Sequence, residues 1–174
     1  AIAFPPSKTV ALSPMLCTVD EAVKLGAKAV GFTIYIGSAH ESVMMKDFEN
    51  VLRTAHSRGL PVIAWIYPRG KSIEGKSARE LLAYSARVGL EIGADIIKIK
   101  WDGSSDDLSW AVRSAGRVRV VVAGGNKVEE GEFIDNIEII MKSGAVGVAV
   151  GRNIWKSSDP IKLSRKIRRV VFKK

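Results

Sequence analysis

Glycine residues divide the chain at regular intervals, and each one separates a helical pattern from a short run of β-branched residues. The glycines that follow the last apolar position of a helical pattern are Gly26, Gly59, Gly93, Gly116 and Gly144. Helices often end in a left-handed residue, a conformation that glycine adopts without steric penalty. The β-branched runs occupy residues 27–35, 60–67, 94–100, 117–123 and 145–150. This alternation predicts βα units, and hence an α/β fold with a parallel sheet covered by helices.

The expected helix starts are marked as well. Capping boxes place a hydroxyl and a carboxylate three residues apart at Thr18 and Glu21, at Ser38 and Glu41, and at Ser77 and Glu80. Apolar residues recur at helical spacing at Met44, Phe48, Val51 and Leu52, at Leu81, Tyr84, Val88 and Ile92, and at Phe133, Ile137 and Ile140. We also expect a weaker extended piece at residues 9–13 and a last helix that begins at Asp159 and Pro160.

Composition predicts a single globular domain over residues 1–174 in a reducing cytoplasm. The chain is 47% hydrophobic and 26% charged, and no apolar run approaches the roughly 20 residues that a membrane helix needs. The start lacks the pattern of a secretory signal. Cys17 is the only cysteine, which excludes an internal disulfide and a cysteine metal cluster. The absence of glutamine and the abundance of Ile, Val, Glu, Lys and Arg are typical of a thermophile.

The net charge of +9 favours an anionic ligand. Nucleic acid is not expected, because no basic run is interleaved with aromatic residues. The densest group of cations falls on the predicted last helix, where we expect a solvated face: Lys162, Arg165, Lys166, Arg168, Arg169, Lys173 and Lys174. A small phosphorylated substrate also fits the positive charge.

Lys98 stands in an apolar run at residues 93–103. Side chains alternate along a strand, so Ile97 and Ile99 face one layer while Lys98 and Lys100 face the other. Repulsion between the two cations and desolvation by neighbouring isoleucines would favour the neutral amine, which is the form that attacks a carbonyl. For this run alone, a half-exposed strand whose lysines point at water is an equal alternative.

Two parallel architectures fit the alternation: a doubly wound sheet and part of a (β/α)8 TIM barrel. A dinucleotide-binding fold needs G-x-G-x-x-G at its first strand-to-helix turn, and the chain has none. Polar and glycine residues instead gather after the strands, at residues 67–70, 98–103, 124–127 and 151–153. Barrel enzymes keep their sites at these strand ends, so the barrel is the better interpretation.

Two of these segments follow consecutive strands and precede helix starts. Gly124 and Gly125 occupy the first, and Gly151 and Arg152 occupy the second. Glycines let backbone amides approach an anion, and a helix start adds partial positive charge. Each segment alone would be a plain turn, but the successive pair predicts a phosphate site.

Trp65 and Tyr67 share one face of the strand beside the one that carries Lys98. A phenol next to an iminium can shuttle the proton that aldol cleavage removes from a substrate hydroxyl. An aromatic pair that fills the core is the alternative.

Five segments in this order and spacing resemble the archaeal-type class I fructose-1,6-bisphosphate aldolases of the DeoC/FbaB group: AVGFTIYIGS, WIYPRGK, GADIIKIKWDG, VVVAGGNK and GAVGVAVGRNIW. The resemblance covers nearly the whole chain. It implies that the chain is the C-terminal part of a (β/α)8 TIM barrel, about strands 4 to 8 with their helices. The expected activity is Schiff-base cleavage or formation of fructose 1,6-bisphosphate, without a metal or other cofactor.

The resemblance also implies roles for individual residues. Lys98 is expected to be the Schiff-base lysine and Tyr67 the general acid/base, while Trp65 borders the substrate and Arg69 reaches the distal phosphate. The expected ligands of the dihydroxyacetone-side phosphate are Gly124, Gly125, Gly151 and Arg152.

The chain departs from the family in three places. Trp101-Asp102-Gly103 stands where members have Tyr-Thr-Gly, and Ala123-Gly124-Gly125-Asn126 stands where they have Ser-Gly-Gly-Pro. Asp102 thereby brings an anion close to the phosphate loops. Members are barrels of about 250 residues, and the strand whose aspartate contacts the substrate hydroxyls has no counterpart here. We therefore expect a homo-oligomer, or another chain that supplies the missing strands.

Two alternative functions stay open. The related 2-amino-3,7-dideoxy-heptulosonate synthase uses the same lysine for transaldol transfer. An inactive fragment or phosphate-binding module needs no reactive amine at all.

Overall fold

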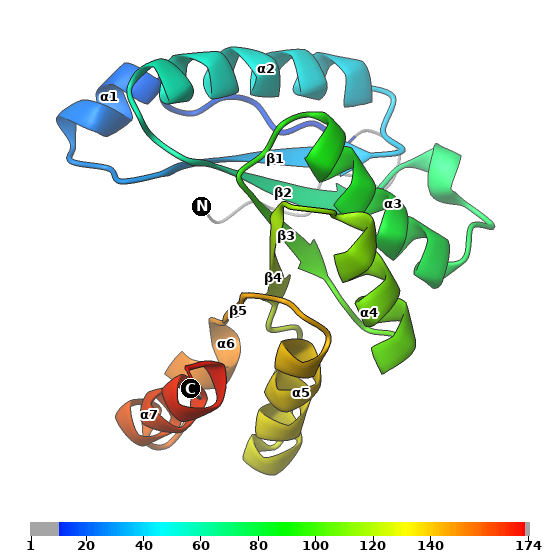
Figure 1. Ribbon diagram of the computed structural model, residues 1–174, viewed down its shortest axis with the longest axis vertical. Coiled ribbons are helices and arrows are strands. Elements are labelled where there is room, and N and C mark those ends of the chain that lie inside the picture. Colours follow the sequence, from blue (N-terminus) through cyan, green and yellow to red (C-terminus); the bar gives the residue numbers. More distant parts are fainter. Residues whose placement is uncertain (1–10, 173–174) are drawn as a thin grey trace.

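The computed structural model describes residues 11–172, in which five parallel strands alternate with helices (Figure 1). The strands are β1 (Val30–Ile36), β2 (Val62–Pro68), β3 (Ile96–Lys100), β4 (Arg119–Ala123) and β5 (Gly147–Ala149). The helices are α1 (Val19–Lys24), α2 (Glu41–Ser57), the 3-10 turn η1 (Lys71–Ile73), α3 (Ala78–Glu91), α4 (Ser105–Ser114), α5 (Glu130–Lys142), α6 (Arg152–Trp155) and α7 (Pro160–Val171). Each strand pairs with the next in the chain, which confirms the predicted βα units.

Most of the predicted helix ends are confirmed. The five glycines expected to end helices all have positive φ, between 58° and 92°. Thr18 and Glu21 form a complete capping box at α1, and the Ser77 hydroxyl accepts from the Glu80 amide at α3. Asp159 caps α7 by accepting from the amide of Lys162.

The capping box predicted at Ser38 is wrong. Helix α2 begins after His40, which makes no side-chain cap. The Ser38 side chain is buried, and its hydroxyl donates to the carbonyl of Ala11, while Glu41 accepts from the amide of Gly37 at 2.5 Å. The hydroxyl accepts from the amide of His40 at 3.2 Å and not from that of Glu41, so Ser38 and Glu41 do not form the reciprocal bonds of a capping box.

The sheet has one dry face and one partly open face. The dry face packs against α2, α3 and α5, and its residues Ile34, Ile66, Ile97 and Val122 are fully buried. The opposite face is only partly buried, and each of the five strands contributes to it: Thr33, Ile63, Trp65, Lys98, Val121, Gly147 and Ala149. A second, smaller apolar cluster joins α5 to α7 through Phe133, Ile137, Leu163 and Ile167.

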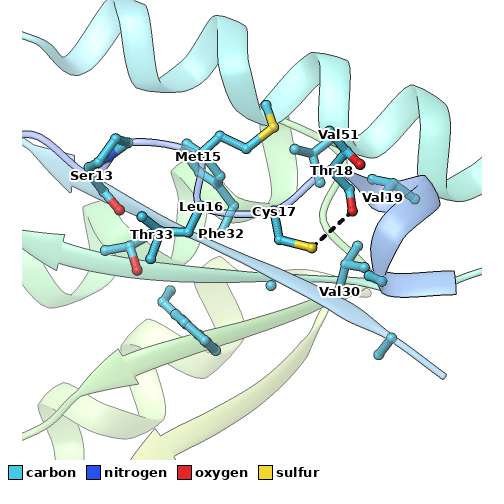
Figure 2. A pocket seen from close by; sticks show the side chains of 15 residues that line it. Ser13, Met15, Leu16, Cys17, Thr18, Val19, Val30, Phe32, Thr33 and Val51 are labelled. Atoms are coloured by element: carbon cyan, nitrogen blue, oxygen red, sulfur yellow. Dashed lines mark hydrogen bonds between the residues drawn. The ribbon is translucent and has the colours of Figure 1, made fainter. Parts of the chain in front are cut away.

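Within residues 11–172 the sheet is open, because β1 and β5 each have one partner strand. A pocket of about 330 Å³ follows the free edge of β1 (Figure 2). Residues 13–19 form its other wall, where Met15 and Leu16 lie near Val30 and Phe32. Of the extended piece expected at residues 9–13, residues 9 and 10 lie outside the described part, and residues 11–13 form no strand. No helix in the described part is long and apolar enough to cross a membrane.

Asp95 ties together the amino ends of the central strands. Its amide donates to the carbonyl of Val62 at 3.1 Å, and its carboxylate accepts from the amide of Val62 at 2.8 Å. The same carboxylate lies 2.9 Å from Nε2 of His56, at the end of α2. Burial raises the pKa of Asp95, but the hydrogen bonds from His56 and Val62 and the charges of His56 and Arg119 outweigh burial and hold the pKa below its usual value.

We predict that Asp95→Asn weakens the fold in a pH-dependent way. A carboxylate whose pKa is lowered by folding stabilises the native state above its unfolded pKa, about 3.9 for aspartate. That stability is lost as the pH falls through the folded pKa. The variant should lose about 1 kcal/mol of unfolding free energy at pH 7, a value kept small because the side chain is 41% exposed.

Urea unfolding at pH values between 7 and 3 measures this effect. The difference between the variant and the original chain should shrink towards pH 3. Asp20→Asn is the matched control, because Asp20 pairs only with exposed Arg58. A difference that stays constant with pH would contradict the role of the ionised carboxylate.

Candidate functional site

Lys98 projects from the centre of β3 onto the partly open face of the sheet. Its Cα is the direct cross-strand partner of Trp65 on β2. The ammonium nitrogen lies 5.4 Å from the centre of the Trp65 ring and 6.0 Å from the centre of the Tyr67 ring. The structure thus brings together the amine and the two aromatic side chains that were expected beside it.

Trp65 leans towards the edge of the sheet. A Cβ atom on Gly31 would come within 3.0 Å of the Trp65 ring, so the indole lies against bare backbone on β1. The indole and Lys98 both remain half-buried. An amine beside two aromatic rings, with partial access to water, can meet a small carbonyl compound from the open face.

Lys100 shares the face of Lys98 but is ion-paired. Its ammonium group lies 2.9 Å from the carboxylate of Asp102, and both side chains are more than half exposed. An exposed pair of this kind contributes only about 0–1 kcal/mol. Asp102 therefore offsets part of the repulsion between Lys98 and Lys100 that the sequence suggested.

The loops after β4 and β5 lie side by side. The amide of Gly124 donates to the carbonyl of Ala149 at 3.0 Å, and a Cβ on Gly124 would lie 3.3 Å from Cα of Val150. This close approach brings Gly124 and Gly125 together with Gly151, as predicted for a phosphate site. The amides of Gly125 and Gly151 have no hydrogen-bond partner within the described residues, so they are available to an anion.

Asn153 fastens the two loops together. Its side chain is 4% exposed, and its amide group donates to the carbonyls of Gly124 and Asn126 at 3.1 and 3.0 Å. Its side-chain oxygen accepts from the amide of Val128 at 3.1 Å. From the sequence, Asn153 was expected only as one of the polar residues in the segment after the last strand, and no role was predicted for it.

Arg152 also bridges the loops, but from the exposed side. Its guanidinium group donates to the carbonyl of Gly125 at 2.9 Å and to the side-chain oxygen of Asn126 at 3.1 Å. Part of its hydrogen-bonding capacity therefore holds the loop.

A cavity of about 370 Å³ opens between the β3–α4 loop and the β4–α5 loop. Lys100 and Asp102 line it from one side, and Gly124, Gly125 and Asn126 line it from the other. The cavity therefore joins the end of the lysine strand to the first of the two candidate phosphate loops, and Phe133, Ile137 and Ile140 of α5 form its apolar wall.

Arg69 does not join this group. Its guanidinium carbon lies 5.5 Å above the ring of Tyr35, and its amide donates to the carbonyl of Ile36 at 2.8 Å. It thus occupies the carboxyl ends of β1 and β2, on the opposite side of β3 from the glycine loops. In the described part of the chain, no three His, Cys, Asp or Glu side chains gather in a way that could hold a metal ion.

Comparison with known proteins places this geometry in a family. The profile of the DeoC/LacD family aldolases matches residues 3–157. The chain is 44% identical over 157 residues to the class 1 fructose-bisphosphate aldolase of Thermoproteus tenax and 41% identical over 155 residues to that of Halobacterium salinarum. These matches cover 90% and 89% of the chain but only 60% and 59% of the relatives, so the chain spans about three fifths of their length.

Solved structures agree. A crystal structure of an archaeal fructose 1,6-bisphosphate aldolase superposes with a TM-score of 0.91 at 42% identity, covering 95% of this chain and 66% of that one. A second archaeal aldolase, whose catalytic lysine is covalently bound to the carbinolamine intermediate of the substrate, superposes with a TM-score of 0.89 at 41% identity. It covers 94% of this chain and 65% of that one.

We predict that Asn153→Ala separates the two glycine loops and destabilises the protein. The change removes three hydrogen bonds from a buried site, each with a net contribution of about 1 kcal/mol, so about 3 kcal/mol should be lost. The matched control is Asn126→Ala, because that exposed side chain accepts a single bond from Arg152 and should cost less than about 1 kcal/mol. Urea unfolding measures both changes, and equal losses would show that Asn153 does not fasten the loops.

Proposed function

Because the chain belongs to the DeoC/LacD family of aldolases and has the fold of a partial TIM barrel, we propose that it carries the Schiff-base machinery of a class I fructose-1,6-bisphosphate aldolase. The observation that carries the proposal is the position of Lys98. Its ammonium group projects from the middle of the sheet onto the open face, within 6.0 Å of the Tyr67 ring centre, and the glycine loops lie on the other side of the same strand.

Lys98 is the proposed nucleophile. Its neutral amine adds to the ketone carbon of the sugar bisphosphate, and loss of water leaves an iminium. When the C3–C4 bond breaks, its electron pair moves into the iminium to give an enamine. The enamine then takes up a proton, and hydrolysis of the imine releases dihydroxyacetone phosphate and restores the amine.

Tyr67 is the proposed proton carrier. Cleavage leaves glyceraldehyde 3-phosphate only if the C4 hydroxyl gives up its proton as the C3–C4 bond breaks. The Tyr67 phenol lies on the same face as Lys98, one strand away, so a substrate bound to the amine can extend across it. Trp65 borders the same space as an apolar wall.

The phosphate next to the ketone is proposed to bind between the two glycine loops. The free amides of Gly125 and Gly151 can donate to its oxygens, and Arg152 adds a positive charge close by. Arg69 is proposed to contact the distal phosphate, which fits its position past Tyr67 at the end of β2.

We predict that dihydroxyacetone phosphate with borohydride leaves a covalent adduct on Lys98. Reduction traps the iminium, so peptide mass spectrometry should find the adduct on the peptide that contains β3. Lys98→Arg should abolish it, because a guanidinium does not form the imine. Lys76→Arg, which changes an exposed lysine before α3, should leave the adduct in place.

Labelling that is spread over surface lysines and survives Lys98→Arg would overturn the proposal. The chain would then be better described as a phosphate-binding module, which needs no reactive amine. An adduct confined to Lys98 would exclude a phosphate-binding module without a reactive amine.

We further predict that the 174 residues alone turn over fructose 1,6-bisphosphate at least about a hundred-fold more slowly than the Thermoproteus tenax relative, since poor substrate positioning costs that much. The family resemblance assigns the carboxylate that contacts the substrate hydroxyls to a strand with no counterpart among the described residues. A coupled assay of triose phosphate release measures the difference. Equal turnover would show that the strands present are sufficient.

A further inference from the structure

We propose that Lys100 is a further phosphate ligand of this site. Its ion pair with Asp102 forms when no phosphate is bound, and phosphate competes with Asp102 for the ammonium group. The inference rests on the proposed function, since it adds a residue to the proposed phosphate site. It assigns a role to the ion pair at the end of β3, where the chain departs from the family pattern.

The register of the sheet places Lys100 beside the phosphate loop. Its Cα is the cross-strand partner of Ala123, the residue directly before Gly124. Adjacent strands lie about 4.8 Å apart, so the lysine stem begins next to the loop whose amide at Gly125 is free. Lys100, Gly124 and Gly125 also line one cavity of about 370 Å³.

Lys100 is the one cation among the described residues that line this cavity, and Arg152 does not line it. Arg152 already donates to the carbonyl of Gly125 and to the side-chain oxygen of Asn126, so part of its guanidinium group is hydrogen-bonded to the loop after β4. Among residues 11–172, the ammonium group of Lys100 pairs only with Asp102, at 2.9 Å, and both side chains are more than half exposed. Such a pair is weak and exchanges readily.

Phosphate competes well for this cation. A phosphate dianion carries more charge than a carboxylate, and it can accept at the same time from the free amide of Gly125, which lines the same cavity. The other charged side chain on the cavity wall is Glu132, which is acidic and cannot replace Lys100. When phosphate arrives, Lys100 turns from Asp102 to the ligand, and Asp102 is released to water.

Asp102 then sets the affinity. It competes with phosphate for one ammonium group, so its removal should tighten binding, and this effect should exist only while Lys100 is present. A carboxylate that simply repelled phosphate would weaken binding with or without Lys100. This difference makes the proposal testable by a double-mutant cycle.

The experiment titrates inorganic phosphate into four proteins at constant ionic strength: the original chain, Asp102→Asn, Lys100→Met and the double variant. The amide resonances of Gly125 and Gly151 report binding at the site. We expect Asp102→Asn to bind about three-fold more tightly, as an exposed pair allows. Lys100→Met should bind about ten-fold more weakly, the scale of a charged hydrogen bond, and the double variant should match Lys100→Met.

Two results would overturn the proposal. One is unchanged affinity in Lys100→Met. The other is an equal gain from Asp102→Asn in the presence and in the absence of Lys100. Thermal unfolding of all four proteins checks that they are folded, which we expect because both side chains are exposed.

A parallel measurement separates this inference from the proposed function. Unphosphorylated dihydroxyacetone with borohydride tests Lys98 without engaging the anion site. An adduct in all four proteins together with a failed cycle would reject the role of Lys100 and leave the Schiff-base lysine intact. If no adduct forms on Lys98 of the original chain, the Schiff-base function is rejected instead.

Discussion

The burial of Ile97 and Ile99 is the constraint on which the candidate site depends. Both side chains are fully buried between β3 and the helices. A strand sends alternate side chains to opposite faces, so Lys98 between them must point to the other face of the sheet. Gly89 makes this packing possible, because a Cβ at that position of α3 would come within 2.1 Å of the Ile97 side chain. A close helix on one face thus fixes the amine on the other.

The same strand divides the site into two halves with different chemistry. On the β2 side lie the aromatic rings of Trp65 and Tyr67, and on the β4 and β5 side lie the glycine loops. A slip of one residue in the register of β3 would turn Lys98 into the helix layer and separate it from both halves. Asp95 opposes such a slip, since it holds Val62 by two hydrogen bonds at the start of the pairing. The hydrogen bonds between Asp95 and Val62 at the amino ends of the strands therefore help to keep Lys98 on the face that carries the candidate site.

Local patterns were enough to predict the order of strands and helices, the glycine helix ends and the face that carries Lys98. These features depend on residues close in sequence, such as the alternation of Ile97, Lys98 and Ile99. Prediction failed where a side chain serves a distant partner. Ser38 resembles a helix cap but bonds to Ala11, and Tyr84 has the spacing of a core residue but is 51% exposed. The role of Asn153 in joining the loops was missed because its three partners lie about 25 to 29 residues earlier in the chain.

The ion pair between Lys100 and Asp102 could not be predicted from the sequence for a related reason. Two lysines on one face suggest mutual repulsion, and only the three-dimensional arrangement shows that one of them is paired. The pairing is local, but its alternative, a phosphate between two loops, depends on the approach of Gly124 to Val150 across two strands. Sequence spacing indicates which residues share a face, and the packing of loops determines what they can bind.

The free edge of β1 lies one strand away from the face residues Trp65 and Tyr67, which border the amine. In the described residues the free edge of β1 borders an apolar pocket, and the face around Lys98 is only partly covered. A strand added along β1 would satisfy backbone groups that now face water, and it would bury Met15, Leu16 and the exposed side of Trp65. The same strand would exclude water from the face that carries Trp65 and Lys98, which are direct cross-strand partners. The edge of β1 and the face that carries the amine would therefore be covered together.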